Sequence, residues 1–175
     1  MKEIEKQQQD TVFEISNQDS NTCDTQGDLY EYVFKENYDI IDFSDKYLAS
    51  DFCNREMDSL YSVFQREDPL QILDFVIPQI GDLFPQTENP FHTPYWGAWD
   101  LGYMYRYLHY STGMHSKDIV SCIDTKTMIQ EMDKHMDWNL EEIADVVVSE
   151  YLQPEHDHHK GWLLQKNEMD SNIER

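Results

Sequence analysis

The sequence predicts an all-α protein: a compact multi-helix bundle around one central aromatic helix, with disordered N- and C-terminal tails. Three observations carry this prediction. Apolar residues recur at intervals of three and four through most of residues 28–153, which is the spacing of one helix face. Residues that favour helix N-termini, among them Asp68, Ser116 and Asp124, precede several of these apolar sets. The stretch 94–113 is aromatic at helical spacing and carries helix start and stop signals at its ends.

Composition divides the chain into three segments. Residues 1–27 are rich in Gln, Asn, Asp, Ser and Thr, so we expect a disordered acidic leader there. Its one apolar cluster, at residues 12–15, leaves open a short docked helix or strand. Residues 28–153 form the expected helical domain, and Pro154 ends it. Residues 154–175 form a polar tail that contains histidines.

The first expected helices lie in residues 28–66. One apolar set at helical spacing precedes Asn37, and a second set runs from Tyr38 to Leu48. Ser50 is a candidate N-cap for a further helix over residues 51–66.

A strongly apolar helix is expected to begin at Pro69, with Asp68 as its N-cap. Pro78 should kink or end this helix near Ile77, because proline lacks an amide donor and clashes with the preceding turn. A strand over residues 72–77 is the alternative. The following residues up to Thr93 are rich in Pro, Gly and Asn, which predicts the main internal loop.

Residues 94–113 are the expected central helix. Thr93 is the candidate N-cap and Pro94 suits the first turn. Gly113 can adopt the left-handed conformation that ends many helices. An aromatic stripe at spacings of three and four runs along this helix: Trp96, Trp99, Tyr103, Tyr107 and Tyr110.

The central helix also has a side made of small residues. Ala98 and Gly102 lie four residues apart, so they share one side of a helix. We expect a second backbone to approach closely there.

Three shorter helices are expected after the central one. They run from Ser116 to about Cys122, from Asp124 to about His135, and over residues 140–152. The last contains a β-branched run, but acidic residues in its first turn favour a helix.

The chain is strongly acidic. Its formal charge is −22, from 35 acidic and 13 basic residues. Residues 28–153 alone hold 24 acids and 8 bases, so the charge belongs to the folded body as well as to the tails. Such a charge repels DNA, RNA and anionic membranes and attracts basic partners. Acidity that serves solubility alone is the alternative.

The cysteines and the apolar residues bear on the compartment. Cys23, Cys53 and Cys122 are odd in number and widely spaced, which predicts reduced thiols. The N-terminal residues have no apolar run typical of a signal peptide, and no apolar segment is long enough to span a bilayer. We therefore expect a soluble, cytoplasmic protein.

Arg106 is the one candidate centre for ligand chemistry. A buried guanidinium must be paired, so the first interpretation is a structural salt bridge to an acid such as Asp74 or Asp100, or stacking on a tyrosine. The alternative is an anion-binding pocket formed by Arg106, Tyr103, Tyr107 and His109.

The sequence gives little support for catalysis or for DNA binding. His109 and His115 flank the turn at Gly113, but no nucleophile motif accompanies them. No phosphate loop, Gly-x-Ser-x-Gly or His-Glu-x-x-His motif occurs, so nothing positive indicates an enzyme. Residues 116–135 are spaced like a helix-turn-helix, but three acids on the second helix oppose binding to a phosphate backbone.

The C-terminal tail contains a histidine tract. Its composition resembles metal-binding tracts, but its spacing matches no standard zinc motif. We expect no cofactor and no functional metal site; the weak candidates for metal binding are His156, His158 and His159.

One motif resembles known sequences. Tyr95-Trp96, then Gly102-Tyr103-Met104-Tyr105-Arg106-Tyr107, Thr112-Gly113 and Ser116-Lys117 follow the order seen in small, uncharacterised bacterial proteins of mobile and defence-associated regions. The resemblance is close over residues 94–120 and looser over 38–150. It implies an all-helical domain with an antitoxin-like or accessory role. It carries over no catalytic residue.

These features together predict an acidic inhibitor or antitoxin-like module that engages a basic surface of a partner protein, acting as a nucleic-acid mimic. No direct contact with nucleic acid or membrane is expected. The alternatives are an enzyme or small-ligand protein with a pocket around Arg106, and a non-catalytic scaffold whose acidity serves solubility. The carboxylates expected to face the partner are Asp39, Asp42, Asp45, Asp58, Glu131, Asp133, Glu141 and Glu142.

Overall fold

The computed structural model describes residues 13–152. The expectations for residues 1–12 and for the His-containing tail lie outside the described residues. Between residues 13 and 152 every regular element is a helix, which confirms the all-α prediction. The described helices include none that is both long and apolar enough to cross a membrane.

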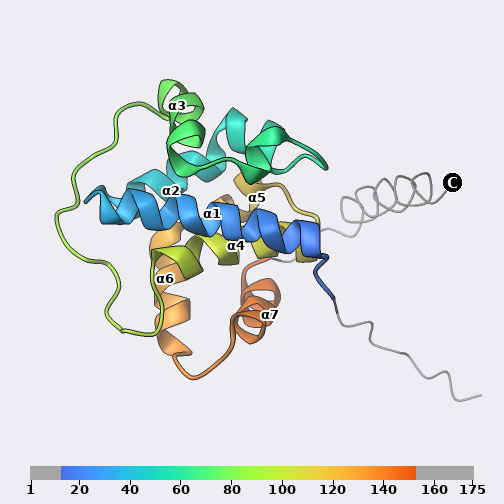
Figure 1. The fold of residues 1–175 in the computed structure, drawn as a ribbon. Helices are drawn as coiled ribbons and strands as arrows, with labels where there is room; N and C mark the ends of the chain where they lie inside the picture. The colour runs from blue at the N-terminus through green and yellow to red at the C-terminus, as the bar shows by residue number, and fades with distance from the viewer. Residues whose placement is uncertain (1–12, 153–175) are drawn as a thin grey trace, which may run out of the picture.

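Seven α-helices and two short irregular helices follow one another along the described chain (Figure 1). The bounds are α1 Asn17–Lys35, α2 Ile40–Ala49, α3 Pro69–Ile80, α4 Ala98–Thr112, α5 Ser116–Cys122, α6 Thr125–Lys134 and α7 Leu140–Glu150. Between α2 and α3 lie the π-helix η1, Cys53–Met57, and the 3₁₀-helix η2, Val63–Arg66.

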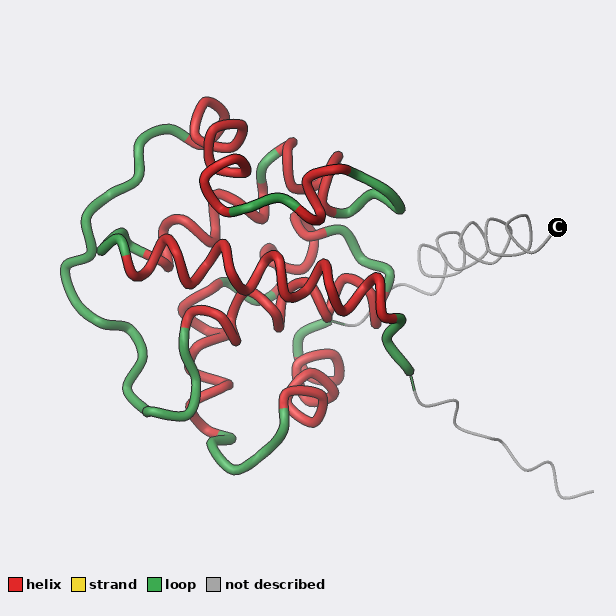
Figure 2. The backbone as a smooth tube through the Cα atoms, in the orientation of Figure 1, coloured by secondary structure: helices red, strands yellow, loops and turns green. Residues whose placement is uncertain are grey.

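Helices α1 and α4 form the centre of the bundle. They pack against each other along their lengths and run in opposite directions, since Asp28 bonds Trp99 while Gln26 bonds Gly102. Helices α2 and α3 lie on one side of this pair, and α6 and α7 lie on the other (Figure 1). Figure 2 shows the long connection between α3 and α4 running around the outside of the bundle.

Helix α1 begins earlier than predicted. It starts at Asn17, so the boundary placed at residue 28 is wrong, and residues 17–27 are helical rather than a disordered leader. Ser16 caps the helix: its Oγ accepts a hydrogen bond of 3.1 Å from the amide of Asp19. The residues that these added turns bury are small or polar, and none is large and apolar: Thr22, Cys23, Gln26 and Gly27.

Helix α3 passes through Pro78. It continues to Ile80, so neither the predicted stop near Ile77 nor the alternative strand over 72–77 is found. Proline at this position removes the hydrogen bond to the carbonyl of Asp74. Because Asp74 is exposed, water can satisfy that carbonyl.

The central helix is confirmed, but it begins at Ala98 and not at Pro94. Its N-cap is Gly97, whose amide donates a 2.9 Å hydrogen bond to Oδ2 of Asp100. The N-cap predicted at Thr93 is therefore wrong. At the other end, Gly113 has a φ of 72°, the left-handed C-cap that the sequence predicted.

The expected close approach of a second backbone is found at Gly102. A Cβ at this position would lie 2.6 Å from the carbonyl oxygen of Gln26 and 2.8 Å from Cγ of Tyr30. Across the same contact, a Cβ on Gly27 would lie 2.7 Å from the ring of Trp99. Two glycines, one on each helix, therefore set the spacing of α1 and α4.

We expect Gly102→Ser to destabilise the fold by about 2 kcal/mol, because the new side chain meets backbone atoms of α1 that cannot rotate away. Urea denaturation measures the free energy of unfolding. Gly97→Ser on the same helix is the matched control; nothing lies closer than 3.9 Å to its added Cβ, and serine is a good N-cap. Equal stability of the two variants would contradict this account of the helix contact.

Candidate functional site

Arg106 lies at the centre of a buried polar cluster. Its Nη1 donates to Oδ1 of Asp58 at 2.5 Å, and its Nε and Nη2 donate to Oε1 of Gln26 at 3.0 and 2.9 Å. Nη2 also lies 3.2 Å from Oγ of Ser116 and 3.3 Å from the sulfur of Cys53. A paired structural arginine was expected, but the partners named for it, Asp74 and Asp100, are wrong.

Asp58 completes the cluster from the end of the π-helix. Besides Arg106, it accepts hydrogen bonds from the amide and the hydroxyl of Ser116, at 2.7 and 2.6 Å. Burial opposes its ionisation, but Arg106, His109, His115 and Ser116 outweigh burial and hold the pKa of Asp58 well below its usual range. Asp58 is only 4% exposed, so the prediction that it faces a partner is wrong.

Two histidines approach the same carboxylate from different environments. His109 is buried, and burial lowers its pKa to about 4, so it is neutral near pH 7. His115 is exposed, and its Nδ1 lies 3.5 Å from Oδ2 of Asp58. The interaction with Asp58 raises the pKa of His115 above its ordinary value.

This cluster joins segments that are distant in sequence. Gln26 comes from α1, Asp58 directly follows η1, Arg106 comes from α4 and Ser116 from α5. The side chains of Arg106 and Asp58 have no exposed surface, and the guanidinium bonds protein groups. The arrangement therefore ties elements together, and it does not present its cation to a ligand in solvent.

The predicted pocket residues fall into two groups. Arg106 and His109 belong to the buried cluster. Tyr103 instead stacks between Trp99 and Tyr107 along α4. The ligand-binding alternative is thus left without its anion-binding group.

The structure bears on metal binding only within the residues that it describes. Within residues 13–152 no three or more His, Cys, Asp or Glu side chains gather as a metal ion would need. The candidates His156, His158 and His159 lie outside the described residues.

All three cysteines are unpaired. Burial raises the pKa of Cys53 to about 11, so its thiol stays neutral near pH 7.

Several acids expected to face a partner have structural roles. Asp39 caps α2 through hydrogen bonds to the amides of Ile41 and Asp42. Asp42 itself pairs with Lys46 at 2.9 Å. Asp45 accepts a hydrogen bond from the amide of Thr125 and so joins α2 to the start of α6.

The later acids divide between the core and the surface. Glu131 is buried at 3% exposure and accepts from Lys134 and Tyr151, so its predicted partner-facing position is wrong. Asp133 is half-buried. Glu141 and Glu142 are exposed on α7, so their contact with a partner stays a prediction.

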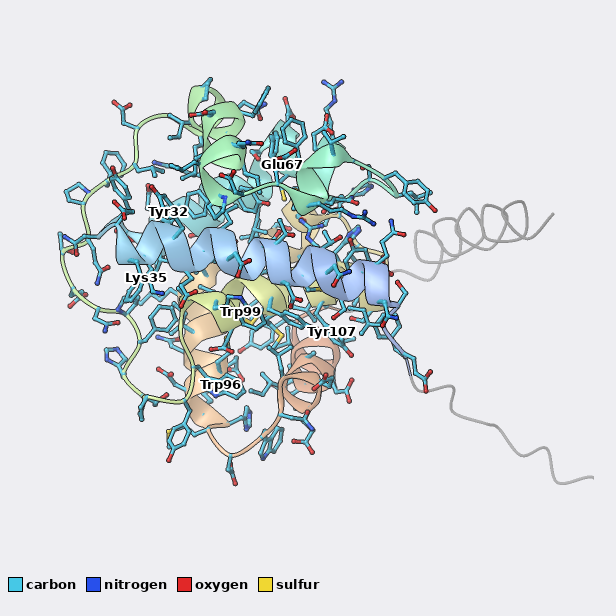
Figure 3. All side chains as sticks on the ribbon, viewed as in Figure 1. Tyr32, Lys35, Glu67, Trp96, Trp99 and Tyr107 are labelled. Carbon is cyan, nitrogen blue, oxygen red and sulfur yellow. The ribbon has the colours of Figure 1, made fainter. Side chains whose placement is uncertain are left out.

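The structure brings together an aromatic strip that we define as Trp99, Tyr103 and Tyr107. Their rings stack in sequence, with centroids 5.2 Å apart for the first pair and 6.4 Å for the second. Figure 3 shows Trp99 on α4 beside the middle of α1, and Tyr107 between α1 and α7. The sequence spacing predicted the stripe, but it did not reveal which carboxylates border it.

Comparisons with known proteins add no relative: no family model, curated protein or solved structure matches this chain. The helical bundle and its own side chains therefore carry the functional argument.

We expect Asp58→Asn to lower the free energy of unfolding by about 3 kcal/mol, because it leaves the buried guanidinium of Arg106 without a counter-charge. Urea denaturation at neutral pH measures the loss. The matched control, Asp42→Asn, breaks the partly exposed pair with Lys46 and should cost about 0.5 kcal/mol. A loss at Asp58 no larger than the loss at Asp42 would refute the structural role of the cluster.

The raised pKa of His115 makes stability depend on pH. Folding favours its protonated form, so this contribution is fully present below its unfolded value of 6.5 and is lost as pH rises through the folded-state pKa. Removing it by His115→Gln should therefore cost more stability at about pH 5.5 than at about pH 8.5.

Urea denaturation of both proteins at the two pH values tests this expectation. His109 has the opposite effect, since its lowered pKa reduces stability as pH falls, but it is present in both proteins and largely cancels in their difference. A gap between wild type and variant that is equal at both pH values would show that His115 acts without its charge.

Proposed function

We propose that this chain is an acidic, antitoxin-like protein that binds a basic surface of a partner protein and restrains it. Carboxylates projecting from rigid helices would take the place of phosphates, so the partner's groove for nucleic acid is the expected contact. Three free cysteines support a reducing compartment, and we place the protein in the cytoplasm.

The imbalance of exposed charge carries this proposal. Within residues 13–152, fifteen acidic side chains are exposed against six basic ones. Arg106, which is fully buried, is neutralised by Asp58, so it does not offset the surface charge. A surface of this kind accelerates association with a cationic partner and repels nucleic acid.

Helix α7 is the best candidate for the contact face. Its buried side is Ile143, Ala144 and Val147, and its outer side carries Glu141, Glu142, Asp145 and Glu150. The helix contains no lysine or arginine. Glu141, Asp145 and Glu150 are therefore available to a partner without competition from cations on the same helix, whereas Glu142 accepts a hydrogen bond from the amide of Asn139 at the start of the helix.

We expect a lysine-rich peptide to bind the full chain with an affinity that falls as salt increases. The double variant Glu141→Gln/Asp145→Asn should bind about fivefold more weakly, because two charges of the contact face are lost. Isothermal titration calorimetry over a series of salt concentrations measures both effects.

The control variant is Asp74→Asn/Asp82→Asn, which removes two exposed charges from α3 and the residues after it. If both double variants weaken binding equally, the charge acts diffusely and the scaffold alternative is favoured. Affinity that does not change with ionic strength would contradict the proposed function altogether.

A further inference from the structure

The aromatic strip is only partly covered. Tyr107 is nearly buried, whereas Trp99 and Tyr103 keep part of their surface accessible. Gly27 packs on the indole of Trp99, so the strip is held against α1 and cannot splay outward. A rigid, half-open row of aromatic rings is a surface on which the apolar stems of long side chains can pack.

Carboxylates border the strip on both sides. On the α1 side, Oδ1 of Asp28 accepts the indole N–H of Trp99 at 3.0 Å, and Asp24 lies one turn earlier. On the α7 side, Glu141 and Asp145 lie one turn apart. Helix α7 packs against α4, which carries the strip, and both acids are exposed on α7. After burial, their charges also contribute to the raised pKa of Tyr107, about 12.

We propose that the aromatic strip, with Asp24 and Asp28 on one side and Glu141 and Asp145 on the other, binds arginine side chains of a basic partner protein. This inference rests on the proposed function and specifies where on the surface the partner docks. Aromatic rings and carboxylates together suit a guanidinium, which is planar, stacks on aromatic groups and binds carboxylates through two parallel hydrogen bonds.

Charge favours a basic partner over the terminal segments of this chain and over a second copy of it. Residues 1–12 hold three acids and two bases, and residues 153–175 hold five acids and three bases. Both segments therefore have the same sign as the acids that border the strip. A second copy of the chain, at a formal charge of −22, is repelled for the same reason.

Two synthetic peptides of equal length and charge, one arginine-rich and one lysine-rich, test the inference by calorimetry with the full chain. The arginine peptide should bind roughly threefold more tightly, because a guanidinium gains more from aromatic contact than an ammonium does. Tyr103→Leu should abolish this preference, and Tyr95→Leu, at a tyrosine that is 64% exposed outside the strip, should retain it.

A measurement on the unaltered protein guards against a variant that fails to fold. In proton–nitrogen NMR, the arginine peptide should shift the indole signal of Trp99, identified from its loss in Trp99→Phe. The indole of Trp138, which is 38% exposed between α6 and α7, should not move. Movement of the Trp138 signal alone would overturn the inference.

The outcomes separate the two proposals. If neither peptide binds the wild-type chain, the proposed function fails. If both peptides bind, but equally well and without a shift at Trp99, the acidic protein still binds cations and only the role of the aromatic strip fails. Arginine preference together with the Trp99 shift supports the inference.

Discussion

The buried ion pair of Arg106 and Asp58 is the interaction on which the arrangement of the bundle depends. A guanidinium without exposed surface is tolerated only when its hydrogen bonds and its charge are satisfied. Arg106 lies on α4, and the groups that satisfy it come from α1, from η1 and the residue after it, and from α5. Each of these elements must keep its position for the charge to stay compensated, so the pair specifies the geometry as well as contributing to stability.

Much of the fold follows from the sequence, because its signals are local. The caps predicted at Asp68 and Asp124 accept hydrogen bonds from the amides of Gln71 and Thr127. The left-handed turn at Gly113 and the close contact at Gly102 are also found as predicted. These features depend on a few neighbouring residues or on helix period, which single-sequence reasoning can read.

The first half of α1 could not be predicted in the same way. Periodicity detects large apolar residues, but this segment packs through Thr22, Cys23, Gln26 and Gly27. In the sequence alone such residues are typical of a polar leader, and only the packing of α4 against α1 shows that they are buried. The role of Asp58 was hidden for a related reason: nothing local distinguishes it from the many acids that remain at the surface, and its partner is 48 positions away.

The π-helix at Cys53–Met57 has a consequence for how insertions and deletions would act. The amide of Asp58 bonds the carbonyl of Cys53, five positions back, so this turn holds one residue more than an α-helical turn. Deleting one residue of this turn would restore an α-helical turn. The residues that follow the turn would then rotate by about 100° about the helix axis. The carboxylate of Asp58 would then swing away from the guanidinium, so the length of this turn is constrained even where its exposed residues are free to vary.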